Sequence, residues 1–167
     1  MAVPELVYLS LGSNIGDRAT HLRAAIQRLA NAGTVQVFST FYETEPVDVQ
    51  DQPWFMNCVV ALETQRSPRE LLDFILAVEI DMGRWRTLDK GPRIIDIDIL
   101  LFGNRVVDDP GLRIPHPAMQ NRRFVLEPLA DIAPDVHHPL LKKSAGQLLA
   151  ELPPGQAILK SKLTPDT

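Results

Sequence analysis

The alternation of apolar and polar residues predicts strands and helices that follow one another in a regular order. Apolar residues recur at helical spacing between Leu22 and Leu29, which predicts a first helix. The segment Ser67-Pro68-Arg69-Glu70 predicts the start of a second helix, because it combines an N-cap serine, a first-turn proline and a capping-box glutamate. Four apolar runs are typical of strands, at residues 6–11, 35–44, 55–64 and 94–102.

The predicted order is therefore β-α-β-β-α-β, the ferredoxin-like arrangement in which two helices pack on one face of an antiparallel sheet. The opposite face of the sheet would be left open for a site. After this unit, Gly103-Asn104 predicts a hairpin and residues 112–116 a short strand or loop. Prolines limit the remainder to short helices, the last over residues 145–152. The fold class is α+β, a ferredoxin-like βαββαβ sandwich with an additional C-terminal hairpin and short helices.

Composition supports one ordinary globular domain over residues 1–167, with a loosely ordered tail from about residue 153. The hydrophobic fraction is 45%, and no stretch approaches the length of a membrane span. Cys58, the single cysteine, lies in an apolar run, so we expect a small core residue rather than a nucleophile. We expect a cytoplasmic monomer that contacts no membrane.

The most informative segment runs from residue 89 to residue 100, where two acids interrupt an apolar strand. The period of two in a strand sends Asp96 and Asp98 to one face and the intervening isoleucines to the other. Two such charges would repel by about 2 kcal/mol at an effective dielectric near 20, a cost that divalent cations remove. Carboxylates at this spacing can bracket a pair of Mg²⁺ ions that hold a polyphosphate. An edge strand with a solvated face is the competing interpretation, but the rigid turn Gly91-Pro92-Arg93 favours phosphate chemistry.

Arginines are concentrated around this strand. The chain carries a formal charge of −4, and a basic nucleic-acid-binding domain would be charged in the opposite sense, so a discrete anion is the better ligand. Guanidinium groups bind phosphate through two parallel hydrogen bonds. Arg84, Arg86 and Arg93 are the best candidates, whereas Arg105 and one of Arg122 or Arg123 are expected to solvate loops or helix ends. Seven arginines and one lysine, Lys90, of the 17 basic residues lie in this region; the arginines are Arg84, Arg86, Arg93, Arg105, Arg113, Arg122 and Arg123.

Several short motifs follow one another along the chain: Gly12-Ser13-Asn14, Phe41-Tyr42-Glu43-Thr44, Asp51-Gln52-Pro53, Phe55-Met56-Asn57, Gly91 to Asp98, and Pro115-His116. Together, in this order, they resemble the hydroxymethyldihydropterin pyrophosphokinase family of folate biosynthesis. The Gly-Pro-Arg-Ile-Ile-Asp-Ile-Asp segment is the family signature, and the resemblance covers about residues 6 to 135. It implies transfer of pyrophosphate from ATP to the hydroxymethyl group of 6-hydroxymethyl-7,8-dihydropterin, with release of AMP and assistance from two Mg²⁺ ions.

The resemblance also implies roles for individual residues. Asp96 and Asp98 would bind the two metal ions, and Arg84, Arg86 and Arg93 would act in catalysis by contacting the phosphates. The pterin would contact Asn57, Thr44 and Val47 and would lie between the rings of Phe55 and Phe124. The nucleotide would contact Glu79, Arg93, Ile99, Arg113, His116 and Arg122.

Two other classes of function share some of these features. The same scaffold serves non-catalytic modules that bind small molecules, which would have no use for paired metal-binding acids beside arginines. A different magnesium-dependent nucleotidyltransferase or phosphotransferase would keep the acids but give other products. Mg²⁺-dependent formation of AMP and a pyrophosphorylated acceptor would distinguish the pyrophosphokinase from the binding module and from the other transferases.

Overall fold

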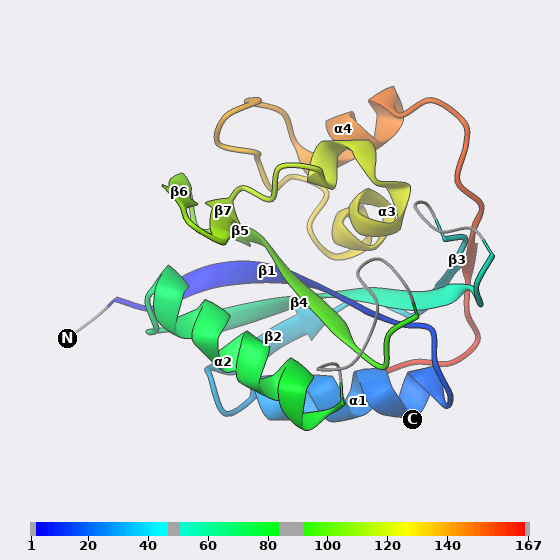
Figure 1. Cartoon of the computed structure of the whole chain (residues 1–167). Coiled ribbons are helices and arrows are strands. Elements are labelled where there is room, and N and C mark those ends of the chain that lie inside the picture. The colour runs from blue at the N-terminus through cyan, green and yellow to red at the C-terminus, as the bar shows by residue number, and fades with distance from the viewer. Residues whose placement is uncertain (1–2, 47–50, 84–91, 166–167) are drawn as a thin grey trace.

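The computed structural model describes residues 3–46, 51–83 and 92–165 of the chain. Its centre is a six-stranded antiparallel sheet in the order β5-β1-β4-β3-β8, with β2 also paired to β4 (Figure 1). The prediction of a mixed fold around an antiparallel sheet is confirmed. The strands of this sheet are β1 (Glu5–Ser13), β2 (Thr34–Phe38), β3 (Tyr42–Thr44), β4 (Phe55–Thr64), β5 (Asp96–Phe102) and β8 (Ile158–Lys160).

The second predicted strand is interrupted, so that β2 and β3 lie one after the other along the same edge of β4. Ser39 joins the two halves. Its N–H donates to the Val59 carbonyl at 2.9 Å, and its hydroxyl accepts from the Val59 N–H at 3.0 Å. A side-chain oxygen thus takes the place of a backbone carbonyl, which keeps the buried N–H group satisfied while the strand is interrupted.

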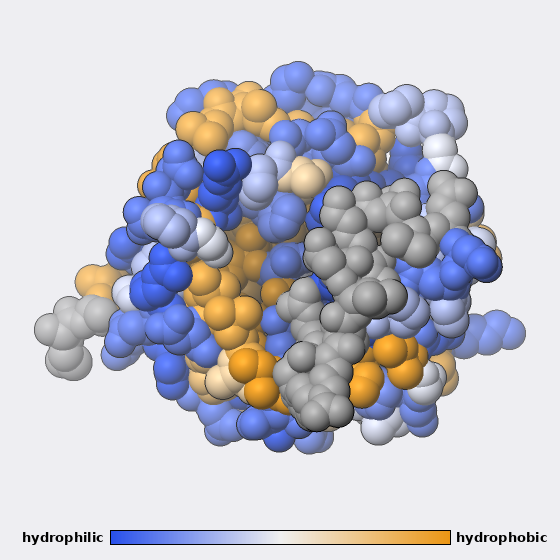
Figure 2. All heavy atoms as spheres, viewed as in Figure 1, coloured by the Kyte–Doolittle hydropathy of each residue, from blue (hydrophilic) through white to orange (hydrophobic). Residues whose placement is uncertain are grey.

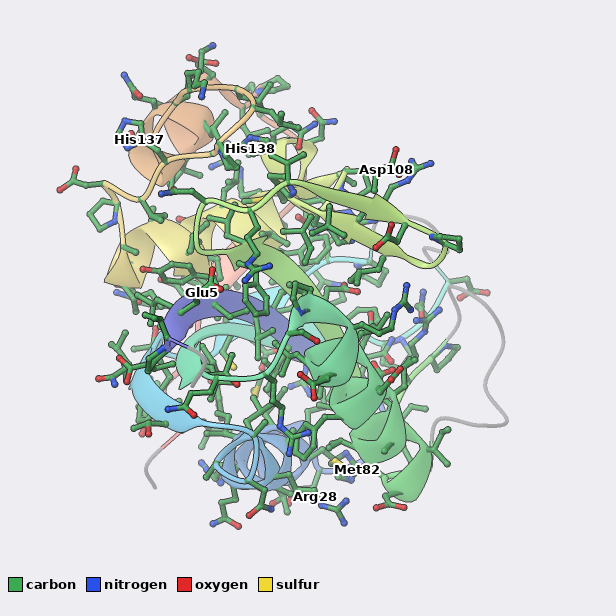
Figure 3. The ribbon with its side chains drawn as sticks, turned by 90° about the vertical axis from the view of Figure 1, so that its left-hand side faces the viewer. Glu5, Arg28, Met82, Asp108, His137 and His138 are labelled. Carbon is green, nitrogen blue, oxygen red and sulfur yellow. The ribbon has the colours of Figure 1, made fainter. Side chains whose placement is uncertain are left out.

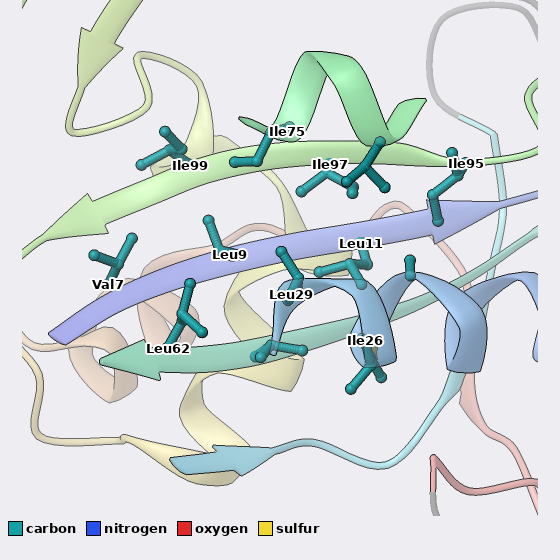
Figure 4. Close-up of a cluster of buried hydrophobic side chains, with 14 of the residues drawn as sticks. Val7, Leu9, Leu11, Ile26, Leu29, Leu62, Ile75, Ile95, Ile97 and Ile99 are labelled. Atoms are coloured by element: carbon teal, nitrogen blue, oxygen red, sulfur yellow. The ribbon is translucent and has the colours of Figure 1, made fainter. Parts of the chain in front are cut away.

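Helices α1 (Arg18–Leu29) and α2 (Pro68–Asp81) cover one face of the sheet, as the sequence predicts. The capping box at the start of α2 is present: the Ser67 hydroxyl accepts from the Glu70 N–H, and the Glu70 carboxylate accepts from the Ser67 N–H. Figure 4 shows the core between these layers, where side chains of alternate strand positions meet both helices. Cys58 is fully buried in this core, and burial raises the pKa of its thiol, in keeping with an inert core residue.

The opposite face of the sheet is not left open along its whole length, which corrects the prediction. Helices α3 (Arg123–Ile132) and α4 (Ala145–Glu151), with the 3₁₀ turn η2 (Met119–Asn121), pack against one end of it. Their apolar side chains bury Tyr8, Val59 and Ala61 in a second hydrophobic cluster. Only the other end of this face remains for a site.

The C-terminal third differs from the prediction in three places. The hairpin joins β6 (Val107–Asp109) to β7 (Leu112–Ile114) and not the strands on either side of Gly103. Gly103, with its φ of +53°, instead forms a turn between β5 and β6. Helix α3 continues through Pro128 because a proline gives up a single backbone donor there while neighbouring apolar residues bury the helix. Strand β8, which pairs with β3, lies in the tail beyond residue 153, where no strand was predicted.

In the part of the chain that the structure describes, no helix combines the length and the apolar character that crossing a membrane requires. Figure 2 shows that the face carrying α2 and β5 mixes hydrophilic and hydrophobic side chains.

Candidate active site

The register of three neighbouring strands brings the chemically active residues into one row. Gly12 of β1 pairs with Asn57 of β4 on one side and with Asp96 of β5 on the other. Two residues earlier in β1, Ser10 lies opposite Asp98. These positions alternate with residues that face α1 and α2, so their side chains belong to the opposite face, at the end that α3 and α4 leave uncovered.

Asp96 and Asp98 lie on this face as the period of two predicts, each partly buried. Arg93 is only 8% exposed, and its guanidinium lies 3.3 Å from the Asp96 carboxylate. The buried Glu79 of α2 accepts a hydrogen bond from the N–H of Ile97 at 2.8 Å, between the two aspartates on the edge strand. Three acids and an arginine therefore surround the start of β5.

An amide and a hydroxyl are buried beside this acidic end. The Asn57 side chain donates to the Leu11 carbonyl at 3.3 Å and accepts from the Thr44 hydroxyl. Gly12 makes this arrangement possible, because a Cβ at that position would come within 2.5 Å of the Asn57 amide nitrogen. The Phe55 ring borders the same space, 3.4 Å from that hypothetical Cβ. A flat, polar heterocycle would find an orienting amide and an aromatic face here.

Asn14 ties three separate segments together just beyond β1. Its side-chain oxygen accepts from the Arg93 N–H at 2.7 Å, and its own N–H donates to the Arg93 carbonyl at 3.0 Å. Its side-chain nitrogen donates to the Gln52 side chain at 2.9 Å and to the Pro53 carbonyl at 3.0 Å. The backbone of Arg93, whose side chain approaches Asp96, and the segment that leads into β4 are thus both hydrogen-bonded to one buried asparagine.

His116 lies between opposite charges at the nucleotide end predicted from the sequence. Burial, together with the positive charge of Arg122, lowers the pKa of His116 from 6.5 to about 4, although Asp96 opposes the change. The ring Nδ1 accepts from the Ala118 N–H at 3.1 Å, so the neutral ring carries its proton on Nε2. A neutral imidazole N–H is a hydrogen-bond donor suited to a phosphate or hydroxyl oxygen.

Two predicted site residues, Arg122 and Phe124, lie together at the start of α3. The Arg122 guanidinium carbon lies 5.5 Å from the centre of the Phe124 ring, a cation–π distance. Tyr42, which pairs with Asn57 across the sheet, lies close to Asp131 near the end of α3. Burial and the negative charge of Asp131 raise the pKa of Tyr42 to about 12.

Other predicted site residues have different surroundings. The Ile99 side chain lies in the core under the helices, so only its backbone can face a ligand. Arg113 is exposed and pairs with Asp108 on the β6–β7 hairpin (Figure 3). Arg105 pairs with Glu5 on the surface, in keeping with a solvating role. Arg84, Arg86 and Val47 lie outside the described residues, as does the segment 86–91.

Sequence reasoning missed the structural roles of Gly12 and Asn14, although both belong to a motif that it singled out. A glycine and an asparagine directly after an apolar run predict a turn, whereas β1 continues through Gly12 to Ser13. Nothing local in the sequence shows that the asparagine reaches two segments 38 and 79 residues away.

The carboxylates of Asp96 and Asp98 suit a magnesium ion that also binds water and substrate better than they suit a metal ion held by protein ligands alone. Among the described residues, no group of three or more histidine, cysteine, aspartate or glutamate side chains could hold an ion. Mg²⁺ commonly uses one or two carboxylates and completes its octahedron with water and substrate phosphates. Asp96 and Asp98 offer that donor set on the open end of the sheet.

Comparison with known proteins identifies the family. A family model described as 7,8-dihydro-6-hydroxymethylpterin-pyrophosphokinase (HPPK) matches residues 8–134. The chain belongs to the HPPK family. The enzyme named 2-amino-4-hydroxy-6-hydroxymethyldihydropteridine pyrophosphokinase from Pseudomonas aeruginosa is 46% identical over 80% of this chain and 83% of its own length. The enzyme of the same name from Aquifex aeolicus is 40% identical over 92% of this chain and 98% of its own length.

Some HPPK relatives are longer. The folic acid synthesis protein FOL1 of Dictyostelium discoideum is 41% identical over 90% of this chain, which spans only 23% of the FOL1 protein. The crystal structure of wild-type HPPK-DHPS from Plasmodium falciparum aligns with 90% of this chain and 45% of its own, with a TM-score of 0.74 and 16% identity. That likeness supports the fold alone.

We predict that the His116 ring of the metal-free protein remains neutral, with its proton on Nε2, down to about pH 4. Because the folded pKa is lower than the ordinary value of 6.5, the stability that depends on the neutral ring is complete above pH 6.5 and is lost as the pH falls toward 4. Ring ¹⁵N chemical shifts during a pH titration measure both the tautomer and the pKa.

The variant His116→Asn provides the matching stability measurement. Urea unfolding of the variant should depend less on pH between 6.5 and 4 than unfolding of the wild type. A His116 ring that takes up its proton near pH 6.5 would contradict the buried geometry.

Proposed function

We propose that this chain transfers the β,γ-pyrophosphoryl group of ATP to the hydroxymethyl oxygen of 6-hydroxymethyl-7,8-dihydropterin, giving the pterin diphosphate and AMP. A bond forms between the hydroxymethyl oxygen and the β-phosphorus. The bond from the β-phosphorus to the oxygen bridging it to the α-phosphate breaks. The hydroxyl proton leaves with solvent, and the step belongs to folate biosynthesis.

The observation that carries the proposal is the row in which Asp96, Gly12 and Asn57 pair across three strands. Carboxylates suited to metal-bound phosphates lie at one end of the row, and a buried amide suited to a heterocycle lies at the other. A transfer between ATP and a pterin needs these two subsites within one substrate length of each other. Family membership and the two enzyme relatives that match most of this chain support the same reaction.

In this proposal, Asn57, with Thr44, orients the pterin edge through an amide that both donates and accepts. Phe55 and Phe124 cover the two faces of the ring, with Val47 completing the pocket. Thr44 is 1% exposed and Asn57 is 4% exposed, so ring atoms that reach them exchange water for hydrogen bonds in a dry site. This geometry favours one orientation of the ring, with its hydroxymethyl group toward the carboxylates.

Asp96 and Asp98 would hold two Mg²⁺ ions against the phosphates. When bound, these ions supply positive charge that neutralises phosphate oxygens as the transfer proceeds. Arg93 lies beside Asp96 and is held at its backbone by Asn14, so its position is fixed before substrates arrive. His116 and Arg122 would offer an N–H donor and a positive charge to the nucleotide, with Glu79 and Arg113 as further predicted nucleotide contacts. Arg84 and Arg86 remain predicted phosphate contacts.

The strand order and the two helices on one face also support our inference that the core is ferredoxin-like. We further propose that the chain acts as a cytoplasmic monomer. The single buried Cys58 is compatible with a reducing compartment.

The direct test mixes the protein with ATP, Mg²⁺ and hydroxymethyldihydropterin and separates the nucleotides and pterins. We expect AMP and pterin diphosphate in equal amounts, and neither product without Mg²⁺ or without the pterin. Formation of ADP, or of free pyrophosphate with a nucleotidylated acceptor, would instead identify another phosphotransferase or nucleotidyltransferase. Absence of any turnover would favour a binding module.

We predict that Asp96→Asn and Asp98→Asn each lower kcat by on the order of 10²–10³-fold, because each removes a carboxylate that binds metal and several kcal/mol of charge stabilisation. Both variants should remain folded, since the two side chains lie at the open end of the sheet. Single-turnover kinetics at saturating Mg²⁺ measure the loss. Asp73→Asn, on the exposed side of α2, is the matched control. Near-normal turnover in either active-site variant would remove the metal assignment.

We predict that Asn57→Ala and Phe124→Ala weaken pterin binding by roughly 1–3 kcal/mol, through unpaired polar ring atoms in one case and lost stacking in the other. Binding of an unreactive Mg-ATP analogue should change little. Gly12→Ala provides an independent version, because its Cβ would displace the Asn57 amide without removing it. Calorimetric titrations measure each affinity, with the exposed Asn104→Ala as control. Wild-type pterin affinity in all three variants would place the pterin elsewhere.

A further inference from the structure

The first turn of α3 lacks the side-chain cap that helices normally have. Its N-cap residue is Arg122, which has no acceptor and makes no capping hydrogen bond. The N–H of Phe124, two positions into the helix, is the donor that an N-cap serine or aspartate would usually satisfy. Here the side-chain oxygen of Gln156 accepts it at 3.2 Å, from 32 residues away.

The same glutamine also binds the backbone next to Thr44, on the other side of the proposed pterin pocket. Its side-chain nitrogen donates to the carbonyl of Glu45, the residue that follows β3 and Thr44. One planar amide thus links the backbone that carries Phe124 to the backbone that carries Thr44. These two residues belong to the proposed pterin pocket and lie on elements that are otherwise distant along the chain.

Gln156 is held in place by the strand that follows it. In β8, Ile158 pairs with Thr44. Glu45 continues this ladder: its N–H donates to the Ala157 carbonyl at 3.0 Å, and its carboxylate accepts from the Ala157 N–H at 3.1 Å. Both backbone polar groups of Ala157, the residue after Gln156, are therefore hydrogen-bonded to Glu45, and this limits the positions that the Gln156 amide can take.

We propose that Gln156 is a positioning residue that sets the separation of the two walls of the pterin pocket. The proposal rests on the function proposed above, because it gives Phe124 and Thr44 their roles. Gln156 lies 22 residues beyond residue 134, where the match to the HPPK family model ends. In this proposal the C-terminal segment, from Gln156 through β8, helps to shape the pterin site.

A purely structural role would give a different result, and two substitutions separate the possibilities. Gln156→Met keeps the length of the side chain and removes both hydrogen bonds. Gln156→Glu keeps an acceptor for the Phe124 N–H, where the positive end of the helix favours a carboxylate, but loses the donor to the Glu45 carbonyl. Leu159→Ala is the control, because that β8 side chain is 62% exposed.

The experiment uses the full chain and measures affinity for 6-hydroxymethylpterin and for an unreactive Mg-ATP analogue by calorimetry, together with urea unfolding. For Gln156→Met we expect pterin affinity to fall by about 5–30-fold, the value of one to two hydrogen bonds. The affinity for the ATP analogue should stay within about twofold. Gln156→Glu should also lose pterin affinity while unfolding at a urea concentration closer to that of the wild type.

Three results would count against the proposal. If Gln156→Met unfolds more easily but binds pterin as the wild type does, the residue only caps α3. If both variants lose affinity for pterin and for the ATP analogue equally, the segment supports the whole fold rather than the pocket. If the wild-type chain itself binds the ATP analogue but no pterin, the proposed function fails, and this inference fails with it.

Discussion

The pairing of β1 with both β4 and β5 is the constraint on which the site depends. It places Gly12 between Asn57 and Asp96, so two neighbouring strand spacings, about 10 Å in all, separate the amide from the carboxylate. A hydrogen-bonded sheet holds this separation far more tightly than loops could. Slipping either strand by one residue would send the polar side chains into the core beneath the helices.

The same face of the sheet is divided between stability and chemistry. At one end, Tyr8, Val59 and Ala61 are covered by α3 and α4 in an apolar cluster. At the other end, polar groups take the equivalent positions and are held in place by buried partners. Asn14, which is only 2% exposed, makes the main connections there. Its backbone and side-chain polar groups form hydrogen bonds to Arg93 and to the Gln52-Pro53 segment. Fixed positions reduce the ordering that substrates would otherwise require.

Local patterns were sufficient to predict the elements whose signals lie within a few residues of each other. The Ser67 capping box, the alternation that exposes Asp96 and Asp98, and the apolar stripe of α1 all follow from neighbours in sequence. The interruption at Ser39, the packing of α3 over one end of a sheet face, and the pairing of β8 with β3 depend on contacts between distant residues. Sequence periodicity carries no information about these contacts, so the fully open face was predicted wrongly and strand β8 was not predicted at all.

The central claim is that one row of the sheet holds phosphates at Asp96 and Asp98 and the pterin at Asn57. A crystal structure of this chain with Mg²⁺, an unreactive ATP analogue and 6-hydroxymethylpterin tests it most directly. The account predicts metal ions bound to both aspartates, the ring hydrogen-bonded to Asn57, and the hydroxymethyl oxygen facing the β-phosphorus. A pterin bound away from Asn57, or phosphates that do not reach the aspartates through metal, would contradict it.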